Sequence, residues 1–337
     1  MSQAYREAGV DIEAGERAVE AMKSSVSATF NSSVLSKLGD FAGLFDLSMV
    51  CGGKERPVLV ASTDGVGTKV EVARKMGRWD TVGQCLVNHC INDILVQGAE
   101  PLFFLDFLGC QKLETEVVCS IVEGIAKACR ENGVALLGGE TAEMGDTYSP
   151  GCYEVAGTIV GLADHGRLLT GKAIEAGDTV LALPSSGLHT NGYTLARKVL
   201  ADLDWKAYQL EGRALGEHLL DVHRCYLPDV RSLRDAGIEI RGLAHVTGGG
   251  LKGNFRRVIP DGLGAEISLR ELTPPPIFSL IKERGSLPFE DMERTFNLGA
   301  GMLVVVPALQ AEAAVSALPE MKPLGEIVVG PEIVVTP

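Results

Sequence analysis

The feature that most restricts the fold of this chain is its glycines, which cluster where short apolar segments end. Forty of the 337 residues are glycine, roughly 12% against a usual ~7%. The clusters are Gly52-Gly53, Gly65 with Gly67, Gly138-Gly139 and Gly248-Gly249-Gly250. Glycine permits positive φ and lets backbone N–H groups approach a ligand closely. Strands that end in such tight turns indicate a fold of both helices and strands, in which some of the turns bind ligands.

Hydrophobic periodicity predicts alternating helices and strands, and therefore an α/β (α+β) fold. An amphipathic helix is predicted over residues 11–27, where apolar residues recur at spacings near 3.6. In the first half we also predict strands at 57–62, 102–105, 134–137 and 153–162, and helices at 79–97 and 116–132. In the second half we predict strands at 179–183, 243–246, 302–306 and 327–335, and helices at 193–203 and 274–281.

Length and a change of composition predict two domains. At about 100–200 residues per domain, a chain of 337 residues is long enough for two domains that each bury a core. The composition changes around residues 164–177. We therefore place the boundary between an N-terminal domain, residues 1–165, and a C-terminal domain, residues 166–337.

Charge, hydropathy and cysteine spacing narrow the class of protein. The 31 basic and 44 acidic side chains give a net charge of −13, and no basic face for nucleic acid stands out. No apolar run approaches the ~18 residues of a membrane span, and the N-terminus does not resemble a secretory signal. The eight cysteines form no CxxC pair, which favours buried thiols in a reducing compartment. We expect a cytoplasmic protein that binds neither nucleic acid nor membranes.

The segment Asp64-Gly65-Val66-Gly67-Thr68-Lys69 follows an apolar strand directly and is the sharpest candidate for a phosphate-binding loop. Two glycines free the backbone to wrap an anion, while Thr68 offers a hydroxyl and Lys69 a charge. Asp64 offers a hard oxygen ligand for Mg²⁺. The alternative is a glycine-rich turn with a solvated lysine.

Acidic residues elsewhere in the first half suggest a magnesium site. On the predicted helix 79–97, His89, Asp93 and Gln97 are spaced four residues apart, and an acid on a mostly buried helix needs a partner. Glu140 follows Gly138-Gly139. Since Mg²⁺ takes one or two carboxylates plus phosphate oxygens, we expect Asp64, Asp93 and Glu140 to serve. A fourth candidate is Asp106, after the strand at 102–105, and a surface stripe or a buried salt bridge is the alternative for the helix.

Two segments of the second half could bind a phosphate monoester. In Ser185-Ser186-Gly187-Leu188-His189-Thr190-Asn191 a strand turns into a helix, and hydroxyls and N–H groups at a helix N-terminus suit an anion. His189 could donate to the anion or move a proton. Thr247-Gly248-Gly249-Gly250 offers a second loop. Ordinary helix capping is the alternative for both.

The ordered set of motifs resembles the phosphoribosylformylglycinamidine cyclo-ligase (AIR synthetase) family of purine biosynthesis. The segments that carry the resemblance are ASTDGVGTKV, VNHCINDILVQGAEPLFFLDF, LLGGETAEM, PSSGLHTNGYTLARKVL, HVTGGGL and RTFNLGAGMLVVV. Single motifs are shared with a wider AIR synthetase-like ATP-binding superfamily, whereas the ordered set is specific to the cyclo-ligases.

The resemblance implies ATP-dependent ring closure of formylglycinamidine ribonucleotide to 5-aminoimidazole ribonucleotide, ADP and phosphate, through a phosphorylated formyl oxygen. It also implies a homodimer whose N-terminal domains bind ATP and Mg²⁺ and pair their sheets into a barrel-like core. The C-terminal domain would be an α/β substrate-binding domain. The implied phosphate-binding residues are Asp64, Gly65, Gly67, Thr68 and Lys69, and the implied Mg²⁺ ligands are Asp64, Asp93 and Glu140. The implied substrate residues are Ser185, Ser186, Gly187, His189, Asn191, Thr247, Gly248 and Gly249, and we expect Lys69, Asp93 and His189 to be catalytic.

One departure and two alternatives accompany the resemblance. The family usually has a basic, glycine-rich loop where this chain has residues 24–40, and Lys23 and Lys37 are the only cations nearby. A sister kinase or selenophosphate synthetase is the nearest alternative, but the latter is expected to have a reactive cysteine followed by lysine, and Cys51 is followed by Gly52. The other alternative is a non-catalytic nucleotide-binding dimer, which would not need the whole set of acids and Lys69.

Overall fold

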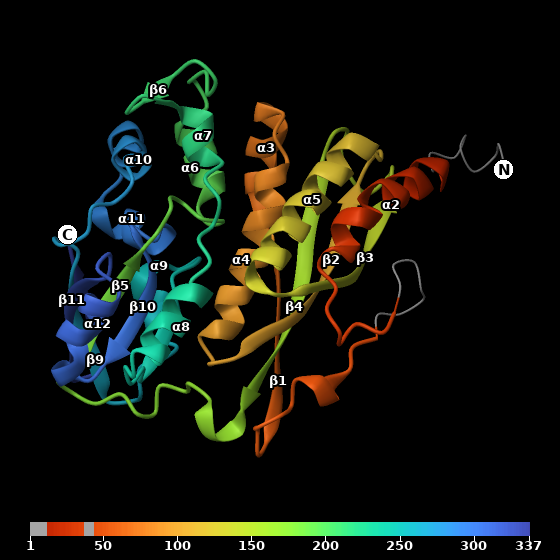
Figure 1. Ribbon diagram of the computed structural model, residues 1–337. Coiled ribbons are helices and arrows are strands. Elements are labelled where there is room, and N and C mark those ends of the chain that lie inside the picture. Colours follow the sequence, from red (N-terminus) through yellow and green to blue (C-terminus); the bar gives the residue numbers. More distant parts are fainter. Residues whose placement is uncertain (1–11, 37–43) are drawn as a thin grey trace. The chain divides into compact units, whose positions relative to one another are not determined.

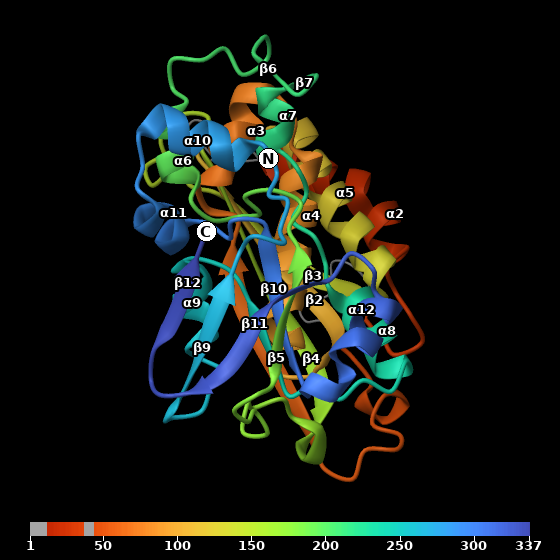
Figure 2. The ribbon, with the colours of Figure 1, turned by 90° about the vertical axis from the view of Figure 1, so that its left-hand side faces the viewer.

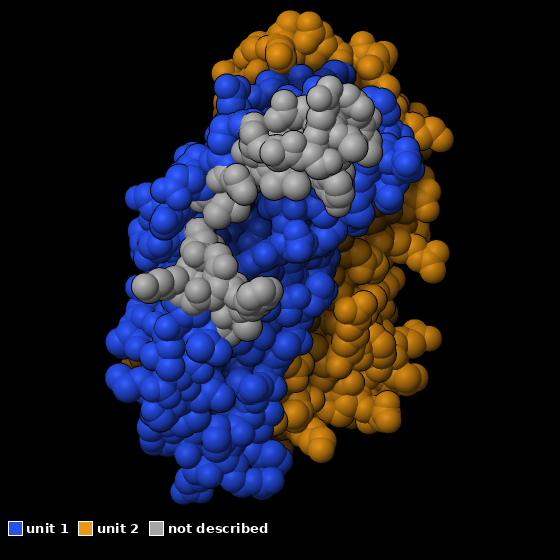
Figure 3. All heavy atoms as spheres, turned by 90° about the vertical axis from the view of Figure 1, so that its right-hand side faces the viewer, with its two compact units in different colours: residues 1–94, 99–166 blue, residues 95–98, 167–337 orange. Residues whose placement is uncertain are grey.

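The computed structural model describes residues 12–36 and 44–337, and the chain divides into two compact units. Unit 1 comprises residues 1–94 and 99–166, and unit 2 comprises residues 95–98 and 167–337 (Figure 3). Lys37, in the segment that departs from the family pattern, lies outside the described residues. Each unit has its own sheet and helices and is described by itself.

Unit 1 is built on a four-stranded sheet in the order β1-β4-β2-β3. The strands are β1 (Pro57–Gly65), β2 (Glu100–Cys110), β3 (Ala135–Glu143) and β4 (Tyr153–Asp164). β4 pairs antiparallel with β1 and β2, whereas β2 and β3 are parallel because helix α5 (Thr115–Asn132) connects them. Exposed and less exposed residues alternate along β1, as expected for a sheet with one covered face.

Helices cover one face of this sheet (Figure 1). They are α2 (Ile12–Ser27), α3 (Val70–Met76), α4 (Asp80–Leu95) and α5. Glycines let α4 and α5 pack closely: a Cβ on Gly83 would lie 2.1 Å from the carbonyl oxygen of Ile121, and one on Gly124 would lie 2.0 Å from that of Asp80. This packing fixes α4, which carries two of the predicted site residues.

Unit 2 contains a six-stranded sheet in the order β12-β9-β11-β5-β10-β8. The strands are β5 (Thr179–Pro184), β8 (Gly242–His245), β9 (Leu263–Ser268), β10 (Ala300–Val306), β11 (Lys322–Val329) and β12 (Ile333–Thr336). Neighbours are antiparallel except β12 and β9. Figure 2 shows β12, β9 and β11 side by side. The core lies against one face of the sheet and includes Val180, Leu303 and Phe255.

Short helices and one small hairpin complete unit 2. The helices are α6 (Tyr193–Val199), α7 (Leu215–Leu219), α8 (Leu227–Asp235), α9 (Gly250–Phe255), α10 (Ile277–Gly285), α11 (Phe289–Thr295) and α12 (Ala311–Ala317). The hairpin pairs β6 (Gln209–Leu210) with β7 (Arg213–Ala214). No helix in the described parts of either unit is both long and apolar enough to cross a membrane.

The α/β prediction is confirmed, and the helices predicted at 11–27 and 116–132 are confirmed to within a residue. Three strands of unit 1 were predicted too short, since β1, β2 and β3 continue to Gly65, Cys110 and Glu143. The reason is pairing with an interior strand: Gly65 of β1 pairs with Ala156 of β4, and Gly138 and Gly139 of β3 pair with Leu105 and Asp106 of β2. These pairings hold glycines that would otherwise weaken a strand.

Several boundaries differ in unit 2 and at the end of α4. The segment 327–335 forms two strands, β11 and β12, separated at Gly330, whose φ is 124°. β10 lies in the interior of the sheet, between β5 and β8. The helix predicted at 193–203 ends at Val199, where the Trp205 indole donates to the Leu200 carbonyl. The helix predicted at 79–97 ends at Leu95, so Gln97 is not on it.

The prolines at 274–276 precede their predicted helix instead of forming its first turn. Helix α10 begins at Ile277, with Pro276 as its N-cap. Proline has no backbone N–H and restricts the residue before it, so a run of three prolines delays the first helical hydrogen bonds.

Candidate functional site

The turn after β1 exposes two of the residues that we expect to bind phosphates. The Gly65 N–H donates to Asp64 Oδ1 over 2.6 Å, and Gly67 has a φ of 59°. Val66 is buried and anchors the turn, whereas Gly67 and Thr68 are exposed. A turn with positive φ, an exposed hydroxyl and an adjacent carboxylate is suited to an anion with a bound cation.

Lys69 closes this turn, but its ammonium group is not solvated. The side chain is fully buried, and Nζ donates to Cys85 Sγ on α4 over 3.1 Å. Burying an ammonium group is costly unless it is hydrogen-bonded. The alternative of a glycine-rich turn with a solvated lysine is therefore wrong, and the positive charge lies on the inner side of the turn.

Asp64 and Asp93 converge on one imidazole. His89 Nε2 lies 2.7 Å from Asp64 Oδ2 and 3.6 Å from Asp93 Oδ2, because His89 and Asp93 share one face of α4. Burial lowers the pKa of His89, but its hydrogen bond to Asp64 and the charge of Asp93 outweigh burial and raise that pKa. Asp93 also accepts a hydrogen bond of 3.2 Å from the Ser62 hydroxyl. Two carboxylates and an imidazole thus form one cluster at the end of β1.

This cluster fits a magnesium ion. Both acids retain solvent contact, with side-chain exposures of 41% for Asp64 and 24% for Asp93, and carboxylates are the hard oxygen donors that Mg²⁺ prefers. Asp93 lies 3.6 Å from His89 Nε2 and keeps 24% of its side chain exposed, so a metal site and a salt bridge both remain open for this helix.

Asp106 lies in a row of paired residues that crosses the sheet of unit 1 from β1 to β3. Strand pairing aligns Asp64 with Gly157, Gly157 with Asp106, and Asp106 with Gly139. A Cβ on Gly139 would lie 2.2 Å from Asp106 Oδ1, so only glycine fits there. Asp106 lies inside β2 instead of ending a strand as predicted. Burial raises the pKa of Asp106 to about 7 despite an opposing backbone hydrogen bond, which makes it a weak metal ligand at lower pH.

Glu140 is not part of the cluster of Asp64, His89 and Asp93. Successive residues of a strand point to opposite faces of the sheet. Gly139 shares a face with Asp106 and Asp64, so Glu140 lies on the other face, where it is exposed. Within one chain the structure brings Asp64 and Asp93 together and does not bring Glu140 to them. Its role as a third metal ligand stays a prediction.

The predicted substrate loop of unit 2 is more buried than expected, and its serine hydroxyls donate to protein atoms. Ser185 Oγ donates to Asn297 Oδ1 over 2.8 Å, and Ser186 Oγ donates to the Val222 carbonyl over 2.6 Å. The Asn297 amide donates in turn to the Gly187 carbonyl. These serines therefore shape the loop and can only accept hydrogen bonds from a ligand.

The second predicted loop lies beside the first. A Cβ on Gly248 would lie 3.2 Å from Asn191 Oδ1, so the two segments meet although these residues lie 57 positions apart in the sequence. Gly248 and Gly249 are exposed, while Asn254 holds Thr247 through its amide group. The Asn191 amide nitrogen is buried without a hydrogen-bond partner, which an acceptor on a ligand would satisfy.

Sequence reasoning missed two histidines that surround His189. The ring of His189 stacks on that of His223 with centroids 4.0 Å apart, and His223 Nε2 lies 3.0 Å from His245 Nε2. His245 and Asn297 lie in the segments HVTGGGL and RTFNLGAGM. Both segments are among those that carry the family resemblance, and this was the signal that could have found the two residues. No sequence pattern singled out His223, which follows α7 in an irregular segment.

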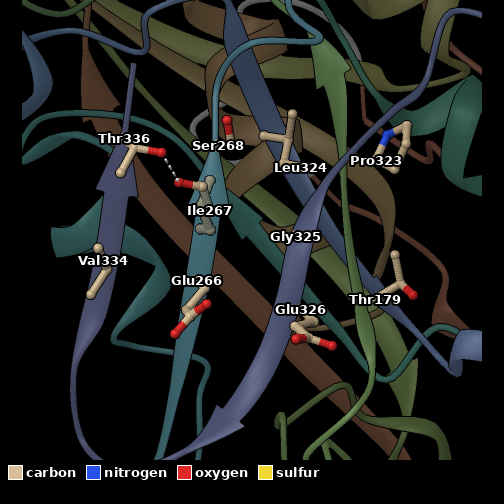
Figure 4. A pocket seen from close by; sticks show the side chains of 10 residues that line it. All are labelled: Thr179, Glu266, Ile267, Ser268, Pro323, Leu324, Gly325, Glu326, Val334 and Thr336. Carbon is tan, nitrogen blue, oxygen red and sulfur yellow. Dashed lines mark hydrogen bonds between the residues drawn. The ribbon is translucent and has the colours of Figure 1, made fainter.

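A hollow is present on the sheet of unit 2. It has a volume of about 560 Å³ and is lined from β9, β11 and β12, with Glu266 and Glu326 among its side chains (Figure 4). None of the predicted site residues lines it. Each unit therefore has its own candidate site, which is the β1 turn and its carboxylates in unit 1 and the two adjacent loops in unit 2.

Comparison with known proteins finds two family domains in this chain. Residues 39–163 match the family "AIR synthase related protein, N-terminal domain", and residues 175–336 match its C-terminal domain. A protein from Alkaliphilus oremlandii named phosphoribosylformylglycinamidine cyclo-ligase is 45% identical over 343 residues, covering 99% of this chain and 100% of the relative.

Solved structures share the fold at low identity. A thiamine-monophosphate kinase from Stenotrophomonas maltophilia has a TM-score of 0.68 at 19% identity, covering 94% of this chain and 95% of that one. The hydrogenase maturation protein HypE in complex with ATP has a TM-score of 0.62 at 17% identity, covering 95% and 90%. The predicted AIR synthetase-like fold is confirmed.

Proposed function

We infer, from the premise that this chain belongs to the AIR synthase related family and to its phosphoribosylformylglycinamidine cyclo-ligases, that it forms a C–N bond by ATP-dependent ring closure. The reaction converts formylglycinamidine ribonucleotide to 5-aminoimidazole ribonucleotide, ADP and phosphate in purine biosynthesis. Within the chain, the observation that carries this function is the convergence of Asp64 and Asp93 on His89 beside the glycine turn after β1.

The chemistry needs activation of one oxygen and orientation of two ends of one molecule. The formyl oxygen is a poor leaving group, so the γ-phosphoryl group of ATP is transferred to it. The nitrogen that bears the ribose then attacks the formyl carbon, and phosphate leaves. Such a reaction is accelerated mainly by positioning and by stabilising phosphoryl charge, and no covalent enzyme nucleophile is required.

In unit 1 we assign the turn Asp64–Lys69 to the phosphates of ATP. Gly67 and Thr68 are exposed for contact, and the buried Lys69 ammonium lies directly after them. We assign Asp64 and Asp93 to Mg²⁺, with Glu140 as a further candidate. When bound, the ion would neutralise phosphate charge during transfer. The ATP complex of HypE, which shares the fold, supports ATP as the nucleotide.

In unit 2 we assign the adjacent loops to the substrate. Gly248 and Gly249 are exposed and free of side chains, which suits a phosphate monoester. Asn191 offers a buried amide nitrogen to an acceptor on the substrate. His189 Nε2 accepts the Ser186 N–H over 3.2 Å, so a neutral His189 carries its proton on Nδ1. We therefore assign His189 as a hydrogen-bond donor that orients the reacting amide.

We also propose a cytoplasmic homodimer that pairs through the face of the unit 1 sheet that no described helix covers. Leu59 and Leu105 on this face are 55% and 37% exposed, and Glu140 lies on the same face. Apolar side chains gathered on one sheet face commonly mark an interface. A dimer that buries them accords with the pairing of N-terminal domains expected from the sequence.

The deciding assay combines purified protein with ATP, Mg²⁺ and formylglycinamidine ribonucleotide and follows formation of the aminoimidazole and of ADP. We expect both products in equal amounts and dependence on all three reactants. ADP without aminoimidazole would instead favour a sister kinase. Nucleotide binding without turnover would favour a non-catalytic dimer.

A further inference from the structure

One buried asparagine of unit 2 holds the proposed substrate loop, residues 185–191. Asn297 lies between α11 and β10 and is 3% exposed. Its Oδ1 accepts the Ser185 hydroxyl over 2.8 Å and the Gly299 N–H over 2.9 Å. Its Nδ2 donates to the Gly187 carbonyl over 2.9 Å. One side chain thus joins the first part of the loop to the turn before β10.

These hydrogen bonds require an amide in one orientation. The Gly299 N–H can only donate and the Gly187 carbonyl can only accept, so the side-chain oxygen must face Gly299 and the nitrogen must face Gly187. In the part of the chain that the structure describes, no other group donates to the Gly187 carbonyl. Gly187 is buried, so loss of the Asn297 amide would leave its carbonyl without a partner, which is costly.

The same turn holds the end of the loop through Phe296. A Cβ on Gly192 would lie 2.3 Å from Phe296 Cε1, so the Phe296 ring packs directly on the residue that follows the loop. At the start of the loop, the Ser185 N–H also donates to the Gly299 carbonyl over 2.8 Å. The turn before β10 therefore contacts the loop at both ends.

Both segments contain a residue other than glycine in the left-handed region. His189, in the loop, has a φ of 61°, and Leu298, in the turn, has a φ of 50°. Such conformations are unfavourable for residues with a side chain and persist where the surrounding contacts hold them, commonly at functional sites. His189 lies between the two anchored glycines, and its Nε2 accepts the Ser186 N–H over 3.2 Å. The anchored ends therefore limit where the His189 ring can lie.

We propose that Asn297 is a positioning residue for ring closure, which keeps His189 in the conformation from which its imidazole orients the reacting amide. This inference rests on the proposed function. Asn297 acts through Gly187 and the loop, without contact to the substrate. Because a displacement of about 1 Å at a reacting group can cost about 100-fold in rate, loss of the amide should lower kcat far more than it weakens the binding of ATP, which we assign to unit 1.

The first test follows the loop directly, without turnover. Hydrogen exchange of the full-length protein, measured by mass spectrometry, should be faster over residues 185–192 in Asn297→Leu than in the wild type. The reason is that the variant has nearly the same volume but none of the three hydrogen bonds. Exchange over β9 should be unchanged, since two strands separate it from β10. Loop exchange as slow as in the wild type would overturn the proposal.

The second test uses the cyclisation assay. Asn297→Leu should lower kcat about 100-fold and leave the KM for ATP within about threefold. Val335→Ala is the matched control, because truncation of a core side chain on the edge strand β12 also lowers the stability of unit 2. Its kcat should stay within about twofold of the wild type. Unchanged kcat in folded Asn297→Leu, or an equal loss in both variants, would refute the role.

The third test separates positioning from stability with a conservative variant. The carboxyl of Asn297→Asp keeps an acceptor for Gly299 and donates to the Gly187 carbonyl only when it is protonated. Burial raises the pKa of a carboxyl, so the ratio of variant to wild-type kcat should rise at least about tenfold from about pH 8.5 to about pH 6. His189, within the loop, and Asp221, whose Cβ lies 3.7 Å from a Cβ on Gly187, occur in both proteins, as do all other titratable groups, so the ratio removes their contribution. A ratio independent of pH would overturn the proposal.

The tests distinguish failure of this inference from failure of the proposed function. If the wild-type protein formed no aminoimidazole, the proposed reaction would fail, while hydrogen exchange would still decide whether Asn297 holds the loop. If Asn297→Leu did not fold, which circular dichroism would show, Asn297→Asp would carry all three tests. Its loop should then exchange faster than that of the wild type at the higher pH, and equal exchange together with wild-type kcat at both pH values would reject the proposal.

Discussion

Asp106 links the fold of unit 1 to pH in a way that can be measured. Its carboxyl lies against Gly139 on the covered face of the sheet, and burial raises its pKa from 3.8 to about 7. Between these two pKa values the native state keeps the proton on Asp106, whereas the unfolded chain has released it. Stability contributed by the neutral acid is present at low pH and is lost as the pH rises from about 4 to about 7.

The size of this effect follows from the displacement of the pKa. About three pKa units at about 1.4 kcal/mol each give ~4 kcal/mol for complete titration. Between about pH 5.5 and about pH 8.5 roughly half of that, ~2 kcal/mol, should be lost. Asp106→Asn has nearly the same shape and no charge to bury. The stability difference between Asp106→Asn and the wild type should therefore change with pH. The excess in free energy of unfolding of the variant should be ~2 kcal/mol larger at about pH 8.5 than at about pH 5.5.

The two tryptophans allow unit 1 to be followed alone. Trp79 lies in unit 1 beside Tyr153, and Trp205 lies in unit 2. In a Trp205→Phe background, urea unfolding followed by fluorescence reports on unit 1 at both pH values. Asp146→Asn, at an exposed acid of the same unit, controls for removal of one charge. A stability difference between Asp106→Asn and its parent that stays constant with pH would refute the reasoning.

Three further predictions concern the metal site, the dimer and the anion loop. Asp93→Asn should retain the fold but raise the Mg²⁺ concentration for half-maximal turnover at least about tenfold; unchanged activity would remove Asp93 from the ligands. Leu59→Lys should shift the protein from dimer to monomer in sedimentation velocity, whereas Leu309→Lys, at a residue 99% exposed in unit 2, should not; a dimeric Leu59→Lys protein would exclude this face. Gly250→Ala, where φ is 67° and a Cβ would lie 1.6 Å from the Glu293 carbonyl oxygen, should destabilise unit 2 by at least about 3 kcal/mol. Gly253→Ala in the same helix meets no atom within 4 Å and should be neutral or stabilising by up to about 1 kcal/mol; equal melting temperatures for the two would contradict the steric argument.

Local patterns predicted most helices and strands because their signals lie within a few residues. The period of 3.6 over residues 116–132 and the apolar run at 153–162 correspond to α5 and β4. Strand ends were less predictable. Whether β3 continues through Gly138 and Gly139 depends on β2, which pairs beside it and lies about 30 residues earlier in the chain.

The candidate site divides in the same way. Residue type and order identified Asp64, Asp93, His189 and the glycine loops, since a phosphate or a cation requires those chemical groups. The sequence could not indicate that Lys69 is buried against Cys85, because a lysine after a glycine turn is equally compatible with solvent. It also could not indicate the face on which Glu140 lies, because alternation along a strand assigns faces only once the register with the neighbouring strands is known.

The sequence by itself determined the family, the alternation of helices and strands, and the kinds of chemical group present at each loop. These follow from short-range propensity and from the ordered motifs. Only the tertiary structure decided which groups meet: His89 between two carboxylates, Asn191 beside Gly248, and His223 between two other imidazoles. Such contacts join residues separated by tens of positions, and they form only when packing and strand register set distances to within a few ångströms.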